Sequence, residues 1–394
     1  MEVLVNPGGP SAVRSDDPAA AGDTVRGDRD LWDEVFASQN LVTALKRVER
    51  NRGAAGVDGV ETHELRDWCR QHWVTTRAAL DAGTYRPSPV RQVMIPKPDG
   101  GQRKLGVPTV LDRLIQQAIA QVLSPVFDPG FVPVSYGFRP GKSAHDAVKV
   151  ARLVIEQGYR WVVEVDLDAF FDRVNHDILI SRVARQVKDK RLLKLIRAYL
   201  EAGIMVDGVR QRAGGGTPQG SPLSPLLSNI MLDDFDQEFW GRGHRFVRYA
   251  DDIRVFVKSK RAAERVLEQS TRLLEQRLKL KVNVAKSVIA PAATAVLLGY
   301  GFYFTSSGVR LRIAPKAWLR AKARIRALTS RRWSVSMDYR VRRLNQYVRG
   351  WMGYFRLAHT PRKFSDLDEW YRRRLRQIRW KEWKRPRTRV ANLR

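Results

Sequence analysis

Two aspartates stand side by side in a stretch that is otherwise typical of paired β-strands. The stretch, residues 246–260, reads FVRYADDIRVFVKSK and places Asp251 and Asp252 between two runs rich in Val, Ile, Phe and Tyr. This pattern predicts a β-hairpin with both carboxylates at its tip. Adjacent carboxylates repel each other, so one would stay protonated unless a cation binds, and Mg²⁺ prefers such oxygen ligands. An exposed Asp-Asp turn is the alternative, because Asp is a common turn residue.

A further aspartate follows a second predicted strand. Residues 161–176 read WVVEVDLDAFFDRVNH, whose valines indicate a buried strand, and Asp166 lies at the end of that strand. Asp168 and Asp172 are weaker candidates, because the alternation of side chains along a strand favours Asp166. Only the fold can bring Asp166 to the other two aspartates. Three carboxylates on neighbouring strands would hold two metal ions, as two-metal phosphoryl transfer requires.

Seven short motifs lie one after another along the chain and include both carboxylate stretches. They are IPKPDGGQRKLGVPTVLDRLIQQAI (95–119), SYGFRPGKSAHDAV (135–148), VDLDAFFDRVNH (165–176), GGTPQGSPLSPLLSNI (215–230), YADD (249–252), LKVNVAKS (280–287) and LGYGF (298–302). In these motifs and in their order the chain resembles group II intron reverse transcriptases, also called maturases, from about residue 31 to residue 384. A chance match to all seven is negligible.

The resemblance implies an α+β fold, in which a right-hand polymerase with antiparallel sheet in its fingers and palm is followed by an α-helical thumb. It divides the chain into a leader (1–30), an N-terminal extension (31–90), fingers and palm (91–310), and a thumb or maturase domain (311–394). The leader is rich in Pro, Gly, Ala and Asp without an apolar period, so we expect it to be disordered or trimmed. In the extension we expect a helix and a Gly-rich turn, to which the family gives a role in template binding.

The resemblance also assigns the reaction and its metal site. Asp166, Asp251 and Asp252 correspond to the catalytic carboxylates, and Leu167 adds a further metal contact beside Asp166. Two Mg²⁺ ions are implied, with Mn²⁺ as a substitute. The expected reaction is RNA-directed DNA synthesis from deoxynucleoside triphosphates (dNTPs).

Residues 91–103 predict a second hairpin, with an apolar strand and a Pro-Asp-Gly-Gly turn. Lys97 and Arg103 lie on opposite arms and could converge on a polyphosphate, Arg through its fork and Lys as a point charge. Solvated turn charges are the alternative. In the resembling polymerases, residues at these places clamp the incoming triphosphate. A helix is expected over residues 111–123, ending before Pro125.

Four more residues are assigned to the nucleotide. Phe171 is expected on a strand, with Phe170 on the opposite face, and the family pattern places this aromatic where a 2′-hydroxyl would clash. The Gly- and Pro-rich loop 214–225 suits a close backbone approach, and Gln219 and Gly220 are its predicted contacts. Lys286 follows a predicted strand, residues 281–284, and lies near the triphosphate in the family. Core packing, a linker and a solvated lysine are the respective alternatives.

Two further elements are expected between the YADD motif and the basic C-terminal part. Residues 262–280 predict a charged amphipathic helix that packs its apolar side chains inward. The motif LGYGF at residues 298–302 corresponds to the primer-grip hairpin of the family.

The net charge of +30 indicates a polyanionic partner. From Arg310 onward there are 27 Lys and Arg against 5 Asp and Glu, a net charge of +22, and six of the eleven tryptophans. Helical spacing of apolar residues there predicts a bundle whose Arg-rich faces bind RNA, although some tryptophans must be core. The predicted RNA contacts in this part are Arg349, Arg372, Arg373, Arg374 and Arg376.

A basic Gly-rich loop before a helix suggests another RNA contact. Arg139 and Lys142 lie in this loop, and Ser143 is placed to cap the helix. A structural turn is the alternative reading.

Other classes are disfavoured by what the sequence contains. Cys69 is the only cysteine, so we expect neither a disulfide framework nor the Cys/His-bearing endonuclease domain of many group II intron proteins. The sequence has no apolar run of about 18 residues, so we expect no membrane partner. The ending at Arg394, soon after the predicted thumb, resembles the short group IIC class, which lacks DNA-binding and endonuclease domains. We expect the protein in the bacterial cytoplasm, associated with ribonucleoprotein at the nucleoid.

The favoured function is an RNA-directed DNA polymerase encoded by a group II intron. It would bind the intron RNA to promote splicing, and would support mobility by target-primed reverse transcription. Its partners would be intron RNA, an RNA template with a DNA primer, dNTPs and target DNA. The sequence leaves the source of the primer open, and a nascent strand at a replication fork is one example. Two alternatives stay open: a maturase acting only as an RNA-binding splicing factor, and a relative recruited to a defence or CRISPR system. The sequence leaves open whether the protein is a monomer or a dimer.

Overall fold

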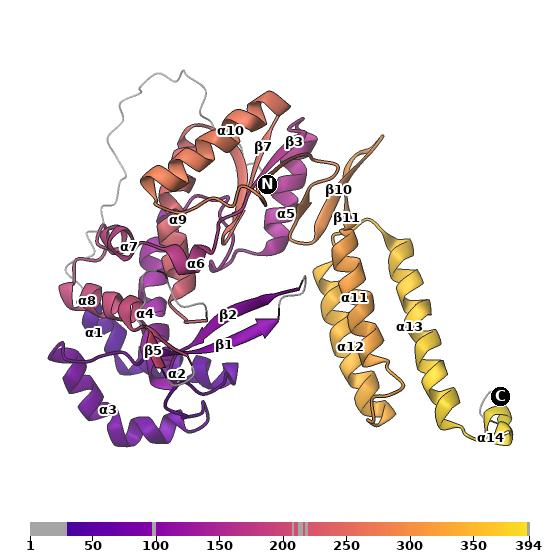
Figure 1. The fold of residues 1–394 in the computed structure, drawn as a ribbon, viewed down its shortest axis with the longest axis horizontal. Coiled ribbons are helices and arrows are strands. Elements are labelled where there is room, and N and C mark those ends of the chain that lie inside the picture. The colour runs from indigo at the N-terminus through magenta and orange to yellow at the C-terminus, as the bar shows by residue number, and fades with distance from the viewer. Residues whose placement is uncertain (1–29, 97–99, 207–208, 212–215, 217–219, 392–394) are drawn as a thin grey trace, which may run out of the picture. The chain divides into compact units, whose positions relative to one another are not determined.

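The computed structural model describes residues 30–96, 100–206, 209–211, 216 and 220–391. Its described residues fall into two units (Figure 1). Unit 1 comprises the described parts of Met1–Ser143, Val163–Val255 and Glu264–Val288, and unit 2 those of Ala144–Val162, Phe256–Ala263 and Ile289–Arg394. The predicted leader falls almost wholly outside the described residues. None of the described helices is long and apolar enough to cross a membrane.

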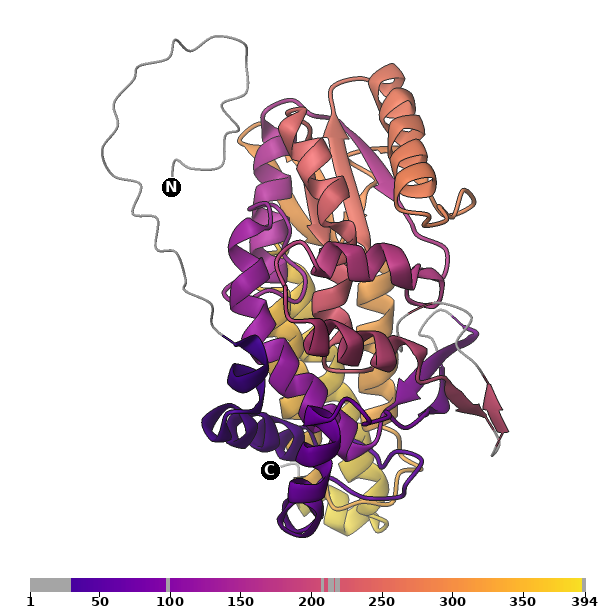
Figure 2. The same ribbon diagram turned by 90° about the vertical axis from the view of Figure 1, so that its left-hand side faces the viewer.

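Unit 1 begins with a group of helices around one buried helix. These are α1 (Leu31–Phe36), α2 (Ser38–Asn51), α3 (Leu65–Asp81) and the central α4 (Val110–Phe127). Figures 1 and 2 show α2 lying along α4, which it contacts. The helix predicted over residues 111–123 is α4. The prediction that it ends before Pro125 is wrong, since α4 continues through the proline. Pro125 lies in the last turn, where it cannot donate to the Gln121 carbonyl, and α4 ends two residues later at Phe127.

A hairpin and two short strands form a separate sheet in unit 1. The strands β1 (Val90–Pro96), β2 (Gln102–Val107), β4 (Ile204–Val206) and β5 (Val209–Gln211) are arranged in the order β2-β1-β4-β5. The strands β1 and β2 are antiparallel, with Ile95 opposite Arg103. The predicted hairpin over residues 91–103 is therefore confirmed.

The central sheet has the order β6-β7-β3-β8. Its strands are β3 (Trp161–Val165), β6 (Arg245–Tyr249), β7 (Asp252–Val257) and β8 (Val288–Pro291). The predicted strand before Asp166 and the predicted hairpin around Asp251 are confirmed, and the strands β7 and β3 are neighbours in the sheet. This adjacency brings positions far apart in the sequence to one sheet.

Further helices complete this part of the chain. They are α6 (Phe170–Arg173), α7 (His176–Val183), α8 (Lys190–Glu201), α9 (Ser224–Gly241), α10 (Lys260–Arg272) and a π-helical turn over Leu273–Arg277. The last two cover most of the predicted amphipathic helix. Two strand predictions are wrong. Phe170 and Phe171 lie in the short helix α6, because Ala169 adopts a left-handed conformation that ends the extended chain, and residues 281–284 form one isolated bridge followed by a turn.

Unit 2 combines a helix, a small sheet and the C-terminal helices. They are α5 (Ala144–Glu156), the strands β9 (Val296–Leu297), β10 (Tyr300–Thr305) and β11 (Gly308–Ile313), and the helices α11 (Pro315–Leu328), α12 (Met337–Tyr354), α13 (Pro361–Glu382) and α14 (Pro386–Ala391). The turn between β9 and β10 confirms the predicted hairpin at residues 298–302. The boundary predicted at residue 310 stays a prediction, since unit 2 also includes α5 and β9 to β11.

The C-terminal helices share one apolar core, which confirms the predicted helical bundle. Ile325 and Leu328 of α11, Leu344 and Val348 of α12, and Leu367 of α13 are buried against one another. Burying large aliphatic side chains between helices stabilises such a bundle. One arginine, Arg340 of α12, is buried with them and donates to the carbonyls of Leu328 and Ser330.

Candidate active site

The two adjacent aspartates lie where β6 turns into β7. Ala250 and Asp251 form the turn, and Asp252 is the first residue of β7. Ala250 has a φ of 58°, in the left-handed region that a non-glycine residue adopts only at some cost in energy. Asp251 is exposed, whereas Asp252 is half-buried. The predicted placement of both carboxylates at the tip of a hairpin is confirmed.

A buried network holds this turn from beneath. The Nε atom of Arg248 lies 2.8 Å from each carboxylate oxygen of Asp236, and its Nη1 donates to the Ala250 carbonyl at 2.9 Å. Arg248 Nη1 also donates to Asn229 Oδ1, and Asn229 Nδ2 donates to the Gly137 carbonyl, both at 2.9 Å. Because Arg248 and Asp236 are completely buried, their hydrogen bonds fix the backbone of the turn.

Gly137 completes the support by a close backbone approach. A Cβ atom at this position would lie 2.2 Å from the Ala250 nitrogen, so only glycine fits. The sequence prediction missed this network, although an arginine within an apolar strand and an aspartate within an apolar helix were visible signals. Buried charges of this kind need partners, which the sequence does not identify.

The third aspartate is fixed by the segment that follows α10. The Asp166 N–H donates to Ser287 Oγ at 3.1 Å, and the Asp166 carbonyl accepts from the Asn283 N–H at 2.8 Å. Leu167 forms an isolated antiparallel bridge with Val282, and its side chain is buried. The only group that Leu167 could offer a metal is therefore its main-chain carbonyl.

The three carboxylates are close enough to influence one another. Burial raises the pKa of Asp166, and the Asp251 charge raises it further, while Lys286 and Arg254 oppose the rise. Burial also raises the pKa of Asp252, with contributions from Glu164, Asp251 and Asp166 and opposition from Arg254. The tertiary structure thus gathers the aspartates of β3 and of the β6–β7 turn beside Lys286, as in a site that favours a cation.

The carboxylates of this site are of the kind that Mg²⁺ binds. Within the described part of the chain, no group of three or more Asp, Glu, His or Cys is placed to hold one ion. Asp252 is ion-paired with Arg254, so its role as a metal ligand stays a prediction, as do those of Asp166 and Asp251. Mg²⁺ commonly binds one or two protein carboxylates and takes its other ligands from water and substrate phosphates, so these residues fit Mg²⁺.

The predicted nucleotide contacts that the structure describes all belong to unit 1, which also contains the three aspartates. Arg103 is exposed on β2, and Lys286 is exposed in the turn after Val282. Gly220 has a φ of 111°, and a Cβ there would lie 2.9 Å from the Gly106 carbonyl, so the Gly220 backbone lies close to β2. Lys97 and Gln219 lie outside the described residues.

Phe171 is half-buried beside the fully packed Phe170, with ring centroids 5.1 Å apart in an edge-to-face arrangement. The backbone of Gly216 lies against it, because a Cβ on that glycine would be 2.5 Å from the Phe171 carbonyl oxygen. Phe170 therefore supplies the core contact of α6, while Phe171 is only partly buried. The role of Phe171 in sugar selection stays a prediction.

Two of the predicted RNA contacts in unit 1 are occupied by the protein itself. Arg139 is ion-paired with Asp128 at 2.7 Å and donates to the carbonyls of Val132 and Ser135, with only 6% of its side chain exposed. Lys142 donates to the Pro133 carbonyl at 3.2 Å. A structural role accounts for Arg139 in full, and an RNA contact by either residue stays a prediction.

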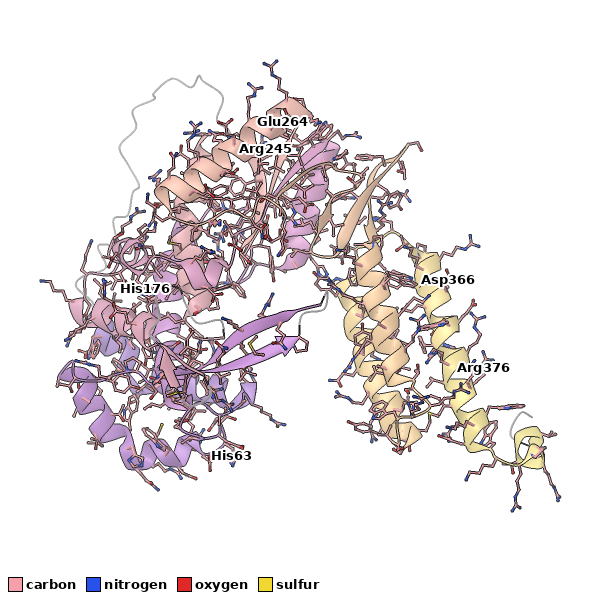
Figure 3. All side chains as sticks on the ribbon, in the orientation of Figure 1. His63, His176, Arg245, Glu264, Asp366 and Arg376 are labelled. Atoms are coloured by element: carbon pink, nitrogen blue, oxygen red, sulfur yellow. The ribbon has the colours of Figure 1, made fainter. Side chains whose placement is uncertain are left out.

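The predicted RNA contacts of unit 2 divide into two kinds. Arg372 is ion-paired with Asp368 at 2.8 Å, and Arg374 donates to Thr329 Oγ1 at 2.7 Å. Arg349, Arg373 and Arg376 are exposed, and among the described residues none has an ion pair or side-chain hydrogen bond. Figure 3 marks Arg376 on α13, beside other basic side chains of that helix. The exposed guanidinium groups are the ones available to a polyanion.

Comparison with known proteins identifies two families along the chain. The reverse transcriptase (RNA-dependent DNA polymerase) family matches residues 95–302, and the maturase-specific domain of group II introns matches residues 319–394. Each of the seven motifs falls within the first match, and the basic helices form most of the second. The reverse transcriptase match alone covers more than half of the chain.

Individual proteins are also similar to the chain. Protein YkfC of Escherichia coli is 35% identical over 289 residues, which covers 63% of this chain and 76% of YkfC. The group II intron-encoded protein LtrA of Lactococcus lactis is 41% identical over 160 residues, which covers 40% of this chain and 26% of LtrA. A chain of the solved partial Cas6-RT-Cas1–Cas2 complex has 28% sequence identity and a TM-score of 0.41, and the match covers 62% of this chain and 42% of that chain.

Proposed function

The chain belongs to the reverse transcriptase family, and from this premise we propose that it is an RNA-directed DNA polymerase encoded by a group II intron. We further propose that it binds the intron RNA to promote splicing. The observation that carries the polymerase assignment is the convergence of Asp166 from β3 with Asp251 and Asp252 from the β6–β7 turn. The splicing role rests on the maturase-specific domain and on its exposed arginines.

The proposed site separates metal binding from substrate binding. Asp166 and Asp251 would hold two Mg²⁺ ions, or Mn²⁺ in their place, with the Leu167 carbonyl as a further ligand. When bound, such ions activate the attacking hydroxyl and stabilise the leaving phosphate. Lys286 lies beside these carboxylates and would neutralise charge on the triphosphate. Arg103 would contribute a bidentate contact to the phosphates, together with Lys97.

The remaining predicted residues would select the nucleotide and hold the template. Phe171 would pack under the sugar and exclude a 2′-hydroxyl, and the loop with Gln219 and Gly220 would contact the base pair. The partners we propose are dNTPs, an RNA template with a DNA primer, and target DNA during target-primed reverse transcription. Such a protein would act in the bacterial cytoplasm as part of a ribonucleoprotein particle.

The polymerase assignment is tested by Asp251→Asn, which removes a proposed metal ligand from an exposed turn. We expect DNA primer extension on an RNA template to fall by about three orders of magnitude or more, since the carboxylate acts on the chemical step. RNA binding should stay nearly unchanged, because affinity comes from phosphate neutralisation by basic residues. Asp177→Asn, at another exposed aspartate, is the matched control and should extend normally.

The same comparison decides between an enzyme and a protein that only binds RNA. A binding-only maturase would show no metal-dependent extension in its unmodified form, while still promoting splicing of the cognate intron at low Mg²⁺. Undiminished extension by Asp251→Asn would contradict the assignment of the site. Splicing by Asp251→Asn should be close to normal, because Asp251 is proposed to bind metal, whereas RNA binding depends on basic residues.

A further inference from the structure

One arginine lies among the carboxylates of the candidate active site. Arg254 is two positions after Asp252 on β7, so the two side chains project from the same face of the strand. Arg254 Nη1 is ion-paired with Asp252 Oδ1, and Arg254 Nη2 lies 3.3 Å from Glu164 Oε2 on the neighbouring β3. Only 14% of the Arg254 side chain is exposed. The guanidinium therefore bridges the two strands that position the aspartates.

The bridge lies close to both strands' functional ends. Glu164 lies near the end of β3, two residues before Asp166, which follows the strand, as Arg254 is two residues after Asp252. The Arg254 charge also acts on Asp166, which it does not contact. Among the described residues, the Nε of Arg254 is buried and has no hydrogen-bond partner, so its position is not explained by complete hydrogen bonding.

A permanent positive charge here has two opposite consequences. It attracts the carboxylates when no cation is present, and it repels a divalent cation that approaches Asp166 and Asp251. Arginine suits the first purpose better than lysine, because its planar fork reaches two carboxylates at once and keeps its charge at any working pH. A positive charge at this place should therefore lower the affinity of the site for a divalent cation, and this decrease can be measured.

We propose that Arg254 is a positioning residue that acts as an internal counter-ion of the active site. Its guanidinium holds the side chains of Asp252 on β7 and Glu164 on β3 in place, so that Asp252 does not coordinate the metal. When the metal has left, the Arg254 charge offsets the negative charge of the carboxylates. The metal ligands are then Asp166 and Asp251. This inference rests on the proposed function, because it presupposes that a divalent cation binds these two aspartates.

The test is the thermal stability of the full chain as Mg²⁺ is added at constant ionic strength, without nucleic acid. Arg254→Gln should unfold at a lower temperature than the unmodified protein in EDTA, and Mg²⁺ should restore much of this loss. The Mg²⁺ concentration at half-effect should fall about tenfold, since one repelling unit charge is removed at close range. Arg254→Lys, which keeps the charge, should stay near the unmodified midpoint.

Two further variants separate this role from ordinary packing. Glu164→Gln removes a negative charge from the bridge, so it should raise the Mg²⁺ midpoint severalfold, opposite in sign to Arg254→Gln. Arg182→Gln breaks a buried ion pair with Asp234 on other helices, so it should lower stability equally with and without Mg²⁺. If that variant does not fold, Arg185→Gln on the same aspartate replaces it.

The outcomes distinguish failure of the inference from failure of the proposed function. If Mg²⁺ raises the stability of the unmodified protein and Asp251→Asn abolishes this effect, the metal site stands. With the metal site standing, an equal stability loss of Arg254→Gln in EDTA and in Mg²⁺, or an unchanged midpoint in both bridge variants, would overturn the role of Arg254. If Mg²⁺ has no effect that depends on Asp251, the proposed site itself fails.

Discussion

The buried arginines of unit 1 and the exposed arginines of α13 in unit 2 serve different purposes. In unit 1, Arg248 is completely buried against Asp236, and Arg182 is buried against Asp234, so their charges are neutralised inside the protein. In unit 2, Arg373 and Arg376 on α13 are exposed and have no acidic partner among the described residues. Buried pairs fix the geometry of a site, whereas unpaired surface charges are free to neutralise phosphates. Chemistry and affinity are therefore assigned to different parts of the chain.

Aromatic residues of unit 2 sharpen this comparison. Trp318, Trp333, Trp351 and Trp370 pack against the apolar core of the bundle, so most of its tryptophans are structural. The side chains of Lys322, Arg326 and Arg374 lie within 5.8 Å of the Trp370 ring centroid. Some basic residues of this unit thus stabilise the bundle through cation–π contacts, and only part of its charge is available to RNA.

The largest effect is expected from breaking a buried pair of unit 1. Asp236→Ala leaves the Arg248 guanidinium buried without its counter-charge, which should lower the free energy of unfolding by about 3–5 kcal/mol. Asp177→Ala breaks the exposed pair with Arg197 and should cost less than about 1 kcal/mol. Chemical denaturation of both variants measures the difference. Equal losses would remove the contrast between buried and exposed charges.

The next effect concerns RNA affinity in unit 2. Changing Arg373 and Arg376 together to Gln should weaken binding of the cognate intron RNA about tenfold or more at low salt. The slope of log affinity against log salt should fall by about 2, one for each lost phosphate contact. Binding measured across a salt series, and splicing at low Mg²⁺, provide the readout.

Arg374→Gln is the matched control for that experiment. Arg374 donates to Thr329 and lies over Trp370, so its loss should lower the stability of the bundle with little change in the salt slope. The full cluster variant, which also changes Arg372, should combine both defects. Normal splicing by the cluster variant, together with defective splicing by Asp251→Asn, would show that RNA folding does not depend on these helices.

Sugar selection in unit 1 should respond to a single aromatic residue. Phe171→Val should raise incorporation of ribonucleotides relative to dNTPs about tenfold, since relief of a clash of about 1.4 kcal/mol has that effect. Phe170→Val is the control, because Phe170 is buried and its loss should reduce stability without changing selection. Steady-state incorporation of each nucleotide gives the ratio. Unchanged selection by a fully active Phe171→Val would mean that Phe171 only packs.

The smallest effect is a pH dependence in unit 1. Burial, with a contribution from Asp236, raises the pKa of Asp233 on α9 to about 6. A raised carboxyl pKa means that the folded state binds the proton more tightly than the unfolded state does. The contribution of this proton to the free energy of unfolding is therefore full below about pH 4 and is lost as the pH rises through 6. Asp233→Asn should therefore stabilise the protein by about 1 kcal/mol at pH 8, a value reduced for partial exposure, and by nothing at pH 4. Melting temperatures at both pH values measure it.

Local sequence patterns were sufficient for several elements of the site. Runs rich in β-branched and aromatic residues predicted β3 and the β6–β7 hairpin with Asp251 and Asp252 at its tip, and the structure confirms both. The Pro-Asp-Gly-Gly turn predicted the β1–β2 hairpin. The prediction failed at Phe171, because Ala169, four residues after the end of β3, adopts a left-handed conformation and α6 begins at the next residue. Periodicity over a few residues does not detect such a single backbone change.

The sequence by itself determined the aspartates, the strands that carry them and the excess of positive charge near the C-terminus. Each depends on residue type and on spacing along the chain. Only the tertiary structure decided which charges have partners. Arg254 lies between Asp252 and Glu164. Arg139 is ion-paired with Asp128, and Arg374 packs on Trp370. Electrostatic pairing depends on distances between side chains from different elements, and on how much water the fold excludes from them.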